Sequence, residues 1–142
     1  QREGGRLCEM LFKRCNAIEK IIADLGPRLP EAQARYREKL MERLDRLDID
    51  HDHARLEQEL ALVAQRLDVT EELDRLAIHV SEVREVLDRD EPIGRRLDFL
   101  MQELNREANT LSSKSQDEEL TRAGVELKVL IEQMREQVQN LE

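Results

Sequence analysis

The sequence has little of what a β-sheet or a turn-rich fold requires. Tryptophan is absent, aromatic residues make up 2% of the chain, and there are five glycines and three prolines. Sheets favour aromatic and β-branched side chains, whereas long helices need neither of them and contain few glycines and prolines. Aliphatic side chains, mainly leucine, must therefore build the core, and the composition predicts an all-α fold.

Positive charge is also scarce. The chain has 23 lysine and arginine residues against 32 aspartate and glutamate residues, which gives a net charge of −9. Proteins that bind nucleic acid without sequence preference are usually basic, because they replace the counterions around the phosphates. The composition by itself therefore argues against a nucleic-acid partner, but it is compatible with a local basic strip or a metal ion between two acidic surfaces.

Long apolar runs and a secretory signal pattern are absent too. No run approaches the roughly 20 apolar residues that span a bilayer. Cys8 and Cys15 would share one helix, where their spacing separates the Cα atoms by about 10.5 Å, too far for a disulfide. We therefore expect a cytoplasmic protein without membrane contact, in which both cysteines are reduced core residues.

Apolar residues recur every three or four positions through most of the chain, which is the spacing of amphipathic helices. The first third contains two such stripes: Cys8, Leu11, Cys15, Ile18, Ile22 and Leu25, then Tyr36, Leu40, Leu44 and Leu47. Gly26 and Pro27 between them predict a helix end. Because this link is short, residues 1–50 are expected to form an antiparallel helical hairpin.

The remaining residues, 51–142, are expected to form a C-terminal helical domain. Its stripes are Leu56, Leu60, Val63 and Leu67; Leu73, Leu76, Val80, Val83 and Leu87; Leu97, Leu100, Met101, Leu104, Ala108 and Leu111; and Leu120, Leu127, Ile131, Met134, Val138 and Leu141. Asp68 or Thr70 is a candidate cap for a new helix, although the helix could equally run through this point without a break. Residues 112–116 are expected to form a polar loop, and Gly124 leaves a gap where another helix can approach. The chain is therefore predicted to be an elongated bundle of about six helices in antiparallel hairpins. Its first and last stripes are coiled-coil-like and also suit self-association.

Two short polar stretches suit either a ligand or a turn. The stretch "DIDHDH", residues 48–53, has Asp and His side chains that bind metals, but a polar turn with Asp as a helix cap is the simpler interpretation. The stretch "SSKS", residues 112–115, offers hydroxyls, backbone N–H groups and Lys114 to a phosphate, or is a plain loop. Walker, zinc-binding and nucleophile-elbow motifs are absent from the sequence.

A polar row accompanies the apolar stripe of "VTEELDRLAIHVSEV", residues 69–83. It consists of Glu71, Glu72, Arg75, His79 and Glu82. These positions fall within about an 80° arc of one helix, beside the apolar stripe. Carboxylates and an imidazole on one arc suit a divalent metal or proton transfer, while ordinary salt bridges on a helix face are the simpler interpretation.

A denser polar set follows in "GRRLDFLMQELNREANT", residues 94–110. One row is Arg95, Asp98, Gln102, Asn105 and Asn109, and the other is Arg96, Phe99, Glu103, Arg106 and Thr110, with Glu107 nearby. Asn and Gln are unusual on a solvated helix face, so they indicate either a ligand surface or a polar network between helices. Glu103 and Glu107 would repel each other without a cation, which could be a metal ion or an arginine such as Arg106.

Three stretches together resemble the C-terminal half of the bacterial YicC/YloC family of endoribonucleases. They are "VTEELDRLAIHVSEV", "IGRRLDFLMQELNREANTLSSKS" and "VELKVLIEQMREQVQNLE", and they occur in the family's order between Leu56 and Glu142. The resemblance implies a cytoplasmic, divalent-metal-dependent enzyme that cuts single-stranded RNA, including small regulatory RNAs, and assembles as a hexamer around an RNA channel. It also implies a preceding domain, so the chain, which begins with Gln1, is expected to be part of a longer protein.

The family's motifs fall on both polar sets. They cover Glu71, Glu72, Arg75 and His79, then Arg95, Arg96, Asp98, Gln102, Glu103, Asn105, Arg106, Glu107 and Asn109, and finally Lys114. On chemical grounds, the residues expected to bind Mn²⁺ or Mg²⁺ and to catalyse cleavage are Glu72, His79, Glu103 and Glu107. Those expected to bind RNA are Arg75, Arg95, Arg96, Arg106, Asn109 and Lys114.

Two other functions are compatible with the sequence. The chain could be a structural helical module for oligomerisation, in which the polar rows form salt bridges between subunits. It could also be an RNA-binding adaptor that delivers transcripts to another nuclease. The scarcity of aromatic residues weakens the adaptor hypothesis, because proteins that bind single-stranded RNA usually stack bases on aromatic rings, and Phe99 is the one aromatic residue within the motifs.

Overall fold

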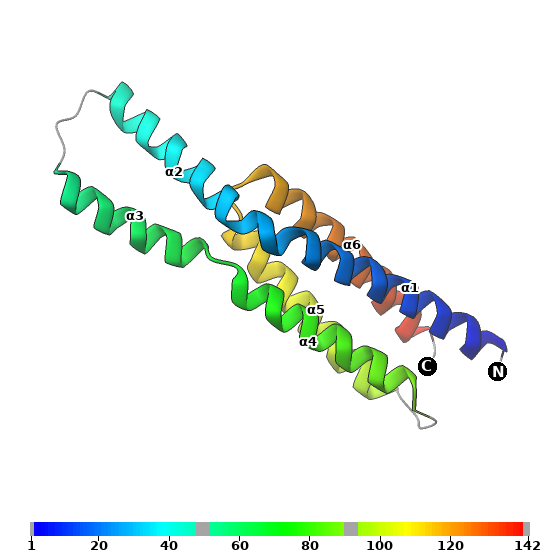
Figure 1. Cartoon of the computed structure of the whole chain (residues 1–142). Coiled ribbons are helices and arrows are strands. Elements are labelled where there is room, and N and C mark those ends of the chain that lie inside the picture. Colours follow the sequence, from blue (N-terminus) through cyan, green and yellow to red (C-terminus); the bar gives the residue numbers. More distant parts are fainter. Residues whose placement is uncertain (1, 48–51, 90–93, 141–142) are drawn as a thin grey trace.

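The computed structural model describes residues 2–47, 52–89 and 94–140, and their regular structure is entirely helical (Figure 1). The elements are α1 (Arg2–Leu25), the 3₁₀ turn η1 (Gly26–Arg28), α2 (Leu29–Arg46), α3 (His53–Leu67), α4 (Thr70–Leu87), α5 (Gly94–Lys114) and α6 (Glu118–Gln139). The prediction of an all-α bundle of about six helices is confirmed. Over the described ranges, no helix is long and apolar enough to cross a membrane.

The core lies in a bundle formed by α1, α4, α5 and α6 (Figure 1). Helix α5 packs against α4 and α6, and α1 packs against the same two helices. In α4, α5 and α6, every described residue of the predicted apolar stripes is buried, whereas Leu141 lies outside the described residues. The spacing of apolar residues therefore predicted this part of the core correctly.

The expected antiparallel hairpin of the first two helices is wrong. Leu25, Arg28 and Leu29 all keep right-handed helical backbone angles, so the chain continues through η1 from α1 into α2 without reversing (Figure 1). Pro27 is tolerated because a proline in the first turn of a helix gives up an N–H that has no partner there. The Gly-Pro pair therefore bends the helix here instead of turning the chain back. The division into segments 1–50 and 51–142 stays a prediction.

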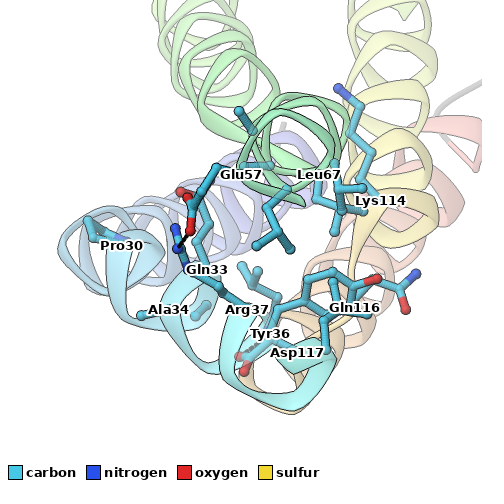
Figure 2. A pocket seen from close by; sticks show the side chains of 17 residues that line it. Pro30, Gln33, Ala34, Tyr36, Arg37, Glu57, Leu67, Lys114, Gln116 and Asp117 are labelled. Atoms are coloured by element: carbon cyan, nitrogen blue, oxygen red, sulfur yellow. Dashed lines mark hydrogen bonds and ion pairs between the residues drawn. The ribbon is translucent and has the colours of Figure 1, made fainter. Parts of the chain in front are cut away.

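Helices α2 and α3 instead project together from one end of the bundle (Figure 1), and the Arg37–Glu57 ion pair links them. Their apolar stripes are only partly covered: Tyr36, Leu40 and Leu44 are half-buried, and Leu47 is 64% exposed. These helices and the start of α6 line a hollow of about 330 Å³. Figure 2 shows its lining residues, with the Arg37–Glu57 ion pair at its side. A two-helix arm cannot bury its apolar faces as fully as a four-helix bundle does.

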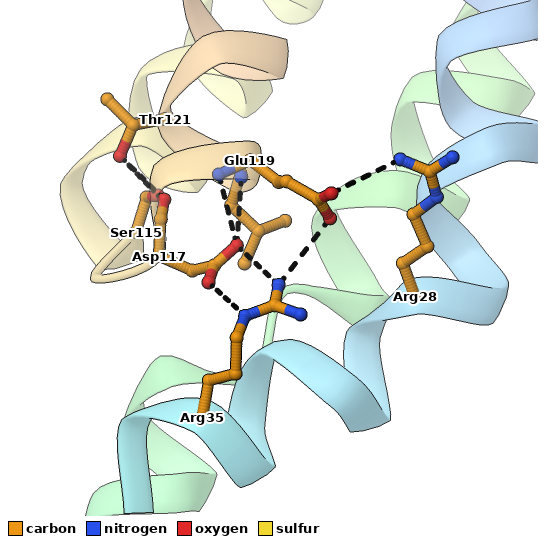
Figure 3. A network of polar contacts seen from close by, with 7 residues as sticks. Arg28, Arg35, Ser115, Asp117, Glu119 and Thr121 are labelled. Atoms are coloured by element: carbon orange, nitrogen blue, oxygen red, sulfur yellow. Dashed lines mark hydrogen bonds and ion pairs between the residues drawn. The ribbon is translucent and has the colours of Figure 1, made fainter. Parts of the chain in front are cut away.

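A polar network joins this arm to the bundle (Figure 3). Arg35 donates two hydrogen bonds of 3.0 Å to the carboxylate of Asp117, and Arg28 pairs with Glu119 at 3.4 Å. Asp117 is also the N-cap of α6, because its side chain accepts hydrogen bonds from the backbone N–H groups of Glu119 and Leu120. The hydrogen bond from Arg35 is the main reason that the pKa of Asp117 lies below its ordinary value. One carboxylate thus starts α6 and holds α2 against it.

Helices α5 and α6 approach each other closely at Gly124, as predicted. A Cβ atom placed on Gly124 would lie 2.6 Å from the Oγ atom of Ser112 on α5. The predicted loop at 112–116 begins too early, because α5 extends through Lys114. Ser113 donates a hydrogen bond of 2.8 Å to the carbonyl of Thr110, and a lysine in the last turn also favours a helix C-terminus.

We predict that the Asp117 carboxylate stabilises the fold in two separable ways. Asp117→Ala should lower the free energy of unfolding by about 1 kcal/mol more than Asp117→Ser, because serine can still cap the helix. Because the folded-state pKa is lowered, the Arg35–Asp117 stabilisation is present above the ordinary carboxyl value of 3.8 and is lost as the pH falls below it. Urea unfolding followed by circular dichroism near pH 7 and about pH 3 tests both points. Equal losses in the two variants would contradict the capping role.

The two cysteines are free, and they should differ in reactivity. Cys15 is fully buried, and its burial raises the pKa of its thiol to about 11. Cys8 is only half-buried, so we predict that a thiol reagent modifies Cys8 quickly and Cys15 only on unfolding. The raised pKa stabilises the fold below pH 9.0, and this contribution is lost as the pH rises from 9.0 towards about 11. Mass spectrometry of the labelled protein, with Cys8→Ser as the control, checks this; rapid modification of Cys15 would refute it.

Candidate functional site

The two polar rows predicted from the sequence face each other across α4 and α5. Arg75 on α4 donates a hydrogen bond of 2.9 Å from Nε to Glu107 on α5. Nearer the C-terminal end of α5, Lys114 lies 2.8 Å from the carboxylate of Glu72 on α4. These two ion pairs show that the rows meet within a single chain, a point that helical spacing alone left open.

Glu72 is the most deeply buried charged residue in the described chain. It is 1% exposed, because it lies on the edge of the stripe that also buries Leu73 and Leu76. Its Oε2 atom contacts Lys114 and lies 3.8 Å from Arg75, while its Oε1 atom is buried without a hydrogen-bond partner. Since burying an unpaired carboxylate is very unfavourable, the contact with Lys114 is what makes this position tolerable.

Arg75 links three acidic side chains while remaining open to solvent. Besides Glu107 and Glu72, its guanidinium pairs with Glu71 at 3.4 Å. The hydrogen bond to Glu107 is the main reason that the pKa of Arg75 is raised, so it keeps its charge. The Arg75 side chain is 45% exposed, whereas that of Glu107 is 8% exposed. The Glu107 carboxylate is therefore buried beneath the Arg75 guanidinium, which faces solvent.

Lys114 connects the site to the break between α3 and α4. In addition to Glu72, its Nζ atom donates a hydrogen bond of 3.3 Å to the backbone carbonyl of Asp68. The Asp68 side chain accepts hydrogen bonds from the N–H and the hydroxyl of Thr70, which begins α4 and lowers the pKa of Asp68. The sequence left open whether the helix runs through this point, and the structure breaks it there, between α3 and α4. Lys114 itself is 32% exposed, so its outer side remains accessible.

His79 lies farther along the same face of α4. Its Nδ1 atom is 3.1 Å from Oε1 of Glu82, one turn away on the same helix. A carboxylate on Nδ1 fixes the orientation of the ring and leaves Nε2 as the nitrogen that faces other groups. The His79 side chain is 18% exposed. Glu82 was in the predicted polar row but not among the predicted site residues, although its position three residues after His79 was a usable signal.

The other predicted site residues lie along α5. Glu103 is half-buried and pairs with the exposed Arg106 at 3.9 Å. Asn109 is exposed. Arg95 and Arg96, near the start of α5, line a shallow hollow together with Glu82, Phe99 and Leu100. Among the site residues of α4 and α5, the buried members are acidic and most of the exposed members are basic.

The arrangement does not fit the expected four-residue metal site. Each of the four predicted ligands already has a protein partner: Lys114 for Glu72, Glu82 for His79, Arg106 for Glu103 and Arg75 for Glu107. Within the described part of the chain, no three His, Cys, Asp or Glu side chains converge as metal ligands. Lys114 and Arg75 would also repel a cation placed beside Glu72. Metal binding by these residues stays a prediction.

The "DIDHDH" stretch is described only in part. Asp52 caps α3, because its side chain accepts a hydrogen bond of 3.0 Å from the backbone N–H of Ala54. This contact agrees with the interpretation of the stretch as a capping turn. Residues 48–51 lie outside the described residues.

The chain also matches known proteins over most of its length. Residues 25–142 match the family described as "Endoribonuclease YicC-like, C-terminal". The chain belongs to this family. A probable endoribonuclease YicC of Haemophilus influenzae is 48% identical over 141 residues, which make up 99% of this chain and 49% of that protein. A probable endoribonuclease YicC of Clostridioides difficile is 39% identical over 143 residues, again 99% of this chain and 49% of that protein. The chain therefore spans about half the length of the curated relatives that it matches.

We predict that the fold becomes less stable when the buried Glu72 carboxylate loses Lys114. Lys114→Met should lower the free energy of unfolding by about 2 kcal/mol, because the carboxylate then lacks its nearest cation. The double variant Glu72→Gln/Lys114→Met should recover most of this loss. Lys128→Met on α6 is the matched control, since Lys128 is also partly buried and has no ion pair within the described part of the chain. Chemical denaturation of the wild type, Glu72→Gln, Lys114→Met and the double variant gives the coupling energy. Strict additivity of the two substitutions would show that the pair does not stabilise the fold.

Proposed function

We propose that this chain is the part of an endoribonuclease that binds single-stranded RNA and cleaves it on the face between α4 and α5. The observation that supports this most strongly is the convergence of the two family motifs on one face, where Glu72 and Glu107 hold Lys114 and Arg75 at the surface. Relatives with 48% and 39% identity carry the name probable endoribonuclease YicC.

In this proposal, the buried carboxylates position the basic groups. Lys114 and Arg75 are cations whose inner sides are bound to Glu72 and Glu107 and whose outer sides remain accessible. Because each cation is already oriented, less side-chain freedom is lost when a phosphate binds. Arg95, Arg96, Arg106 and Asn109 would extend the contact along α5. The local concentration of basic groups on this face lets an acidic chain bind a polyanion.

His79 is the residue on this face that is best suited to proton transfer. Its imidazole is oriented by Glu82 and partly exposed. A histidine in this setting can take a proton from an attacking hydroxyl or donate one to the leaving oxygen of the phosphodiester. The same chemistry applies whether the nucleophile is water or the 2′-hydroxyl of the RNA. We assign no step to the expected divalent cation; its requirement, the hexamer and the cytoplasmic location stay predictions.

A second candidate function is a structural module that docks other helices. It is favoured by the exposure of large apolar residues on the projecting arm, where Leu47 is 64% and Leu62 is 51% exposed. Such a module would need the arm but not the ion pairs between α4 and α5. Substitutions on the two surfaces therefore separate the two functions.

We predict that His79→Gln lowers the turnover rate for RNA cleavage by roughly 100-fold or more and changes the Michaelis constant little, because it removes a proton-transfer group. Glu72→Gln should weaken RNA binding as well as cleavage, because Lys114 loses the charge that orients it. The assay uses a labelled single-stranded RNA with this chain, alone and within a protein of the relatives' full length.

The matched control is Glu85→Gln, an exposed carboxylate on α4 outside the polar row. Circular dichroism of each variant verifies that it is folded. Unchanged cleavage in both His79→Gln and Glu72→Gln would show that the α4–α5 face is not the catalytic surface. Repeating the reaction with a chelator and added Mn²⁺ or Mg²⁺ tests the expected metal requirement independently.

A further inference from the structure

The hollow near the start of α5 is lined by an aromatic ring that is not part of the hydrophobic core. Phe99 is 56% exposed, whereas its neighbours Leu97, Leu100 and Met101 are all buried. Phe99 is also one of only two phenylalanines in the chain. The hollow has a volume of about 500 Å³ and is lined by Glu82, Arg95, Arg96, Phe99 and Leu100. A ring at the wall of a hollow that is also lined by charged side chains is suited to a ligand with a flat apolar part and a charged part.

The charges around this ring favour an anionic ligand. Arg95 and Arg96 are exposed, and neither has an ion-pair or hydrogen-bond partner among the residues that the structure describes. Glu82, the acidic residue in the lining, has one carboxylate oxygen at His79. The hollow thus combines a flat apolar ring with two guanidinium groups. A nucleotide has the matching parts, a base that stacks on a ring and a phosphate that binds arginine.

The hollow is adjacent to the residues that the proposed function uses. Glu82 lines it and at the same time orients His79. On α5, Phe99 and Glu107 are eight residues apart, which corresponds to about 12 Å along the helix axis. An RNA strand that leaves the hollow along α5 would therefore pass His79 and Glu103 before it reaches Arg75 and Lys114. A ligand in the hollow would therefore lie next to His79 and Glu82.

We propose that this hollow binds one unpaired nucleotide of single-stranded RNA, with its base stacked on Phe99 and its phosphates at Arg95 and Arg96. This inference rests on the proposed function for the identity of the ligand. It adds a selectivity for unpaired RNA, because a base within a duplex is already stacked between its neighbours and cannot lie on the ring. Phe99 is thereby a positioning residue that sets which nucleotide lies beside His79.

The absence of tryptophan from the chain permits a direct test. In the variant Phe99→Trp, the indole is the single tryptophan and should be quenched by a base that stacks on it. The probe is a short single-stranded 2′-O-methyl oligoadenylate, so that cleavage at a free 2′-hydroxyl is not involved. The matched control is Val125→Trp on α6, because Val125 is also 56% exposed. Saturable quenching in Phe99→Trp, and none in Val125→Trp, is the expected result.

Binding of the same probe to other variants separates the ring from the arginines. Phe99→Ala should weaken binding about tenfold or more at every salt concentration. Arg95→Ala and Arg96→Ala should each reduce the slope of log affinity against log salt by roughly 0.7, the value for one phosphate contact on a single strand. Phe99→Leu should resemble Phe99→Ala, since leucine keeps an apolar side chain but has no ring.

The outcomes distinguish this inference from the proposed function. No quenching in Phe99→Trp, equal quenching in Val125→Trp, or equal quenching by a duplex of the same length would each overturn the nucleotide site. Quenching by the single strand, together with undiminished cleavage in His79→Gln and Glu72→Gln, would support the site and overturn only the catalytic assignment. Circular dichroism confirms that each variant is folded before binding is measured.

Discussion

A single buried carboxylate constrains how the helices of this protein meet. Glu72 lies in the apolar interior edge of α4, and Lys114 must reach it from the last turn of α5. The same ammonium group also binds the backbone carbonyl of Asp68 at the break between α3 and α4. This one ammonium group therefore ties the end of α5 both to the start of α4 and to the break between α3 and α4. Alternatives that shift α5 by a turn would leave a buried charge without a partner.

The same burial of carboxylates lets a chain with a net charge of −9 present mainly basic groups at its candidate site. Glu72 and Glu107 are buried and do not face solvent, so they contribute little repulsion to an approaching polyanion. Their charges are balanced by Lys114 and Arg75, which face outward. Net charge sums over all ionised groups, so it does not show that the carboxylates of the site are buried while its cations are accessible. The argument from net charge against a nucleic-acid partner is therefore weak for this chain.

The sequence predicted the bundle well because the apolar stripes of α4, α5 and α6 are long and regular. It predicted the arm poorly, since Gly26 and Pro27 are compatible with both a reversal and a bent helix, and contacts distant in sequence decide between them. The Arg35–Asp117 contact is such an interaction, and no local sequence pattern predicts it. For the site, helical spacing correctly placed the polar residues on shared faces. It could not show that Arg75 and Lys114 bind the carboxylates that had been assigned to a metal.

Figure 1 shows that α1 begins and α6 ends at the same end of the bundle, opposite to the arm, and that α4 connects to α5 there as well. Anything fused to either terminus, whether a neighbouring domain, a fluorophore or a surface linker, would therefore sit at the end that carries the Phe99 hollow. The arm would stay clear of it by the length of the bundle, about 30 Å for a helix of some 20 residues. The molecule thus presents two well-separated ends that can be labelled, tethered or obstructed independently.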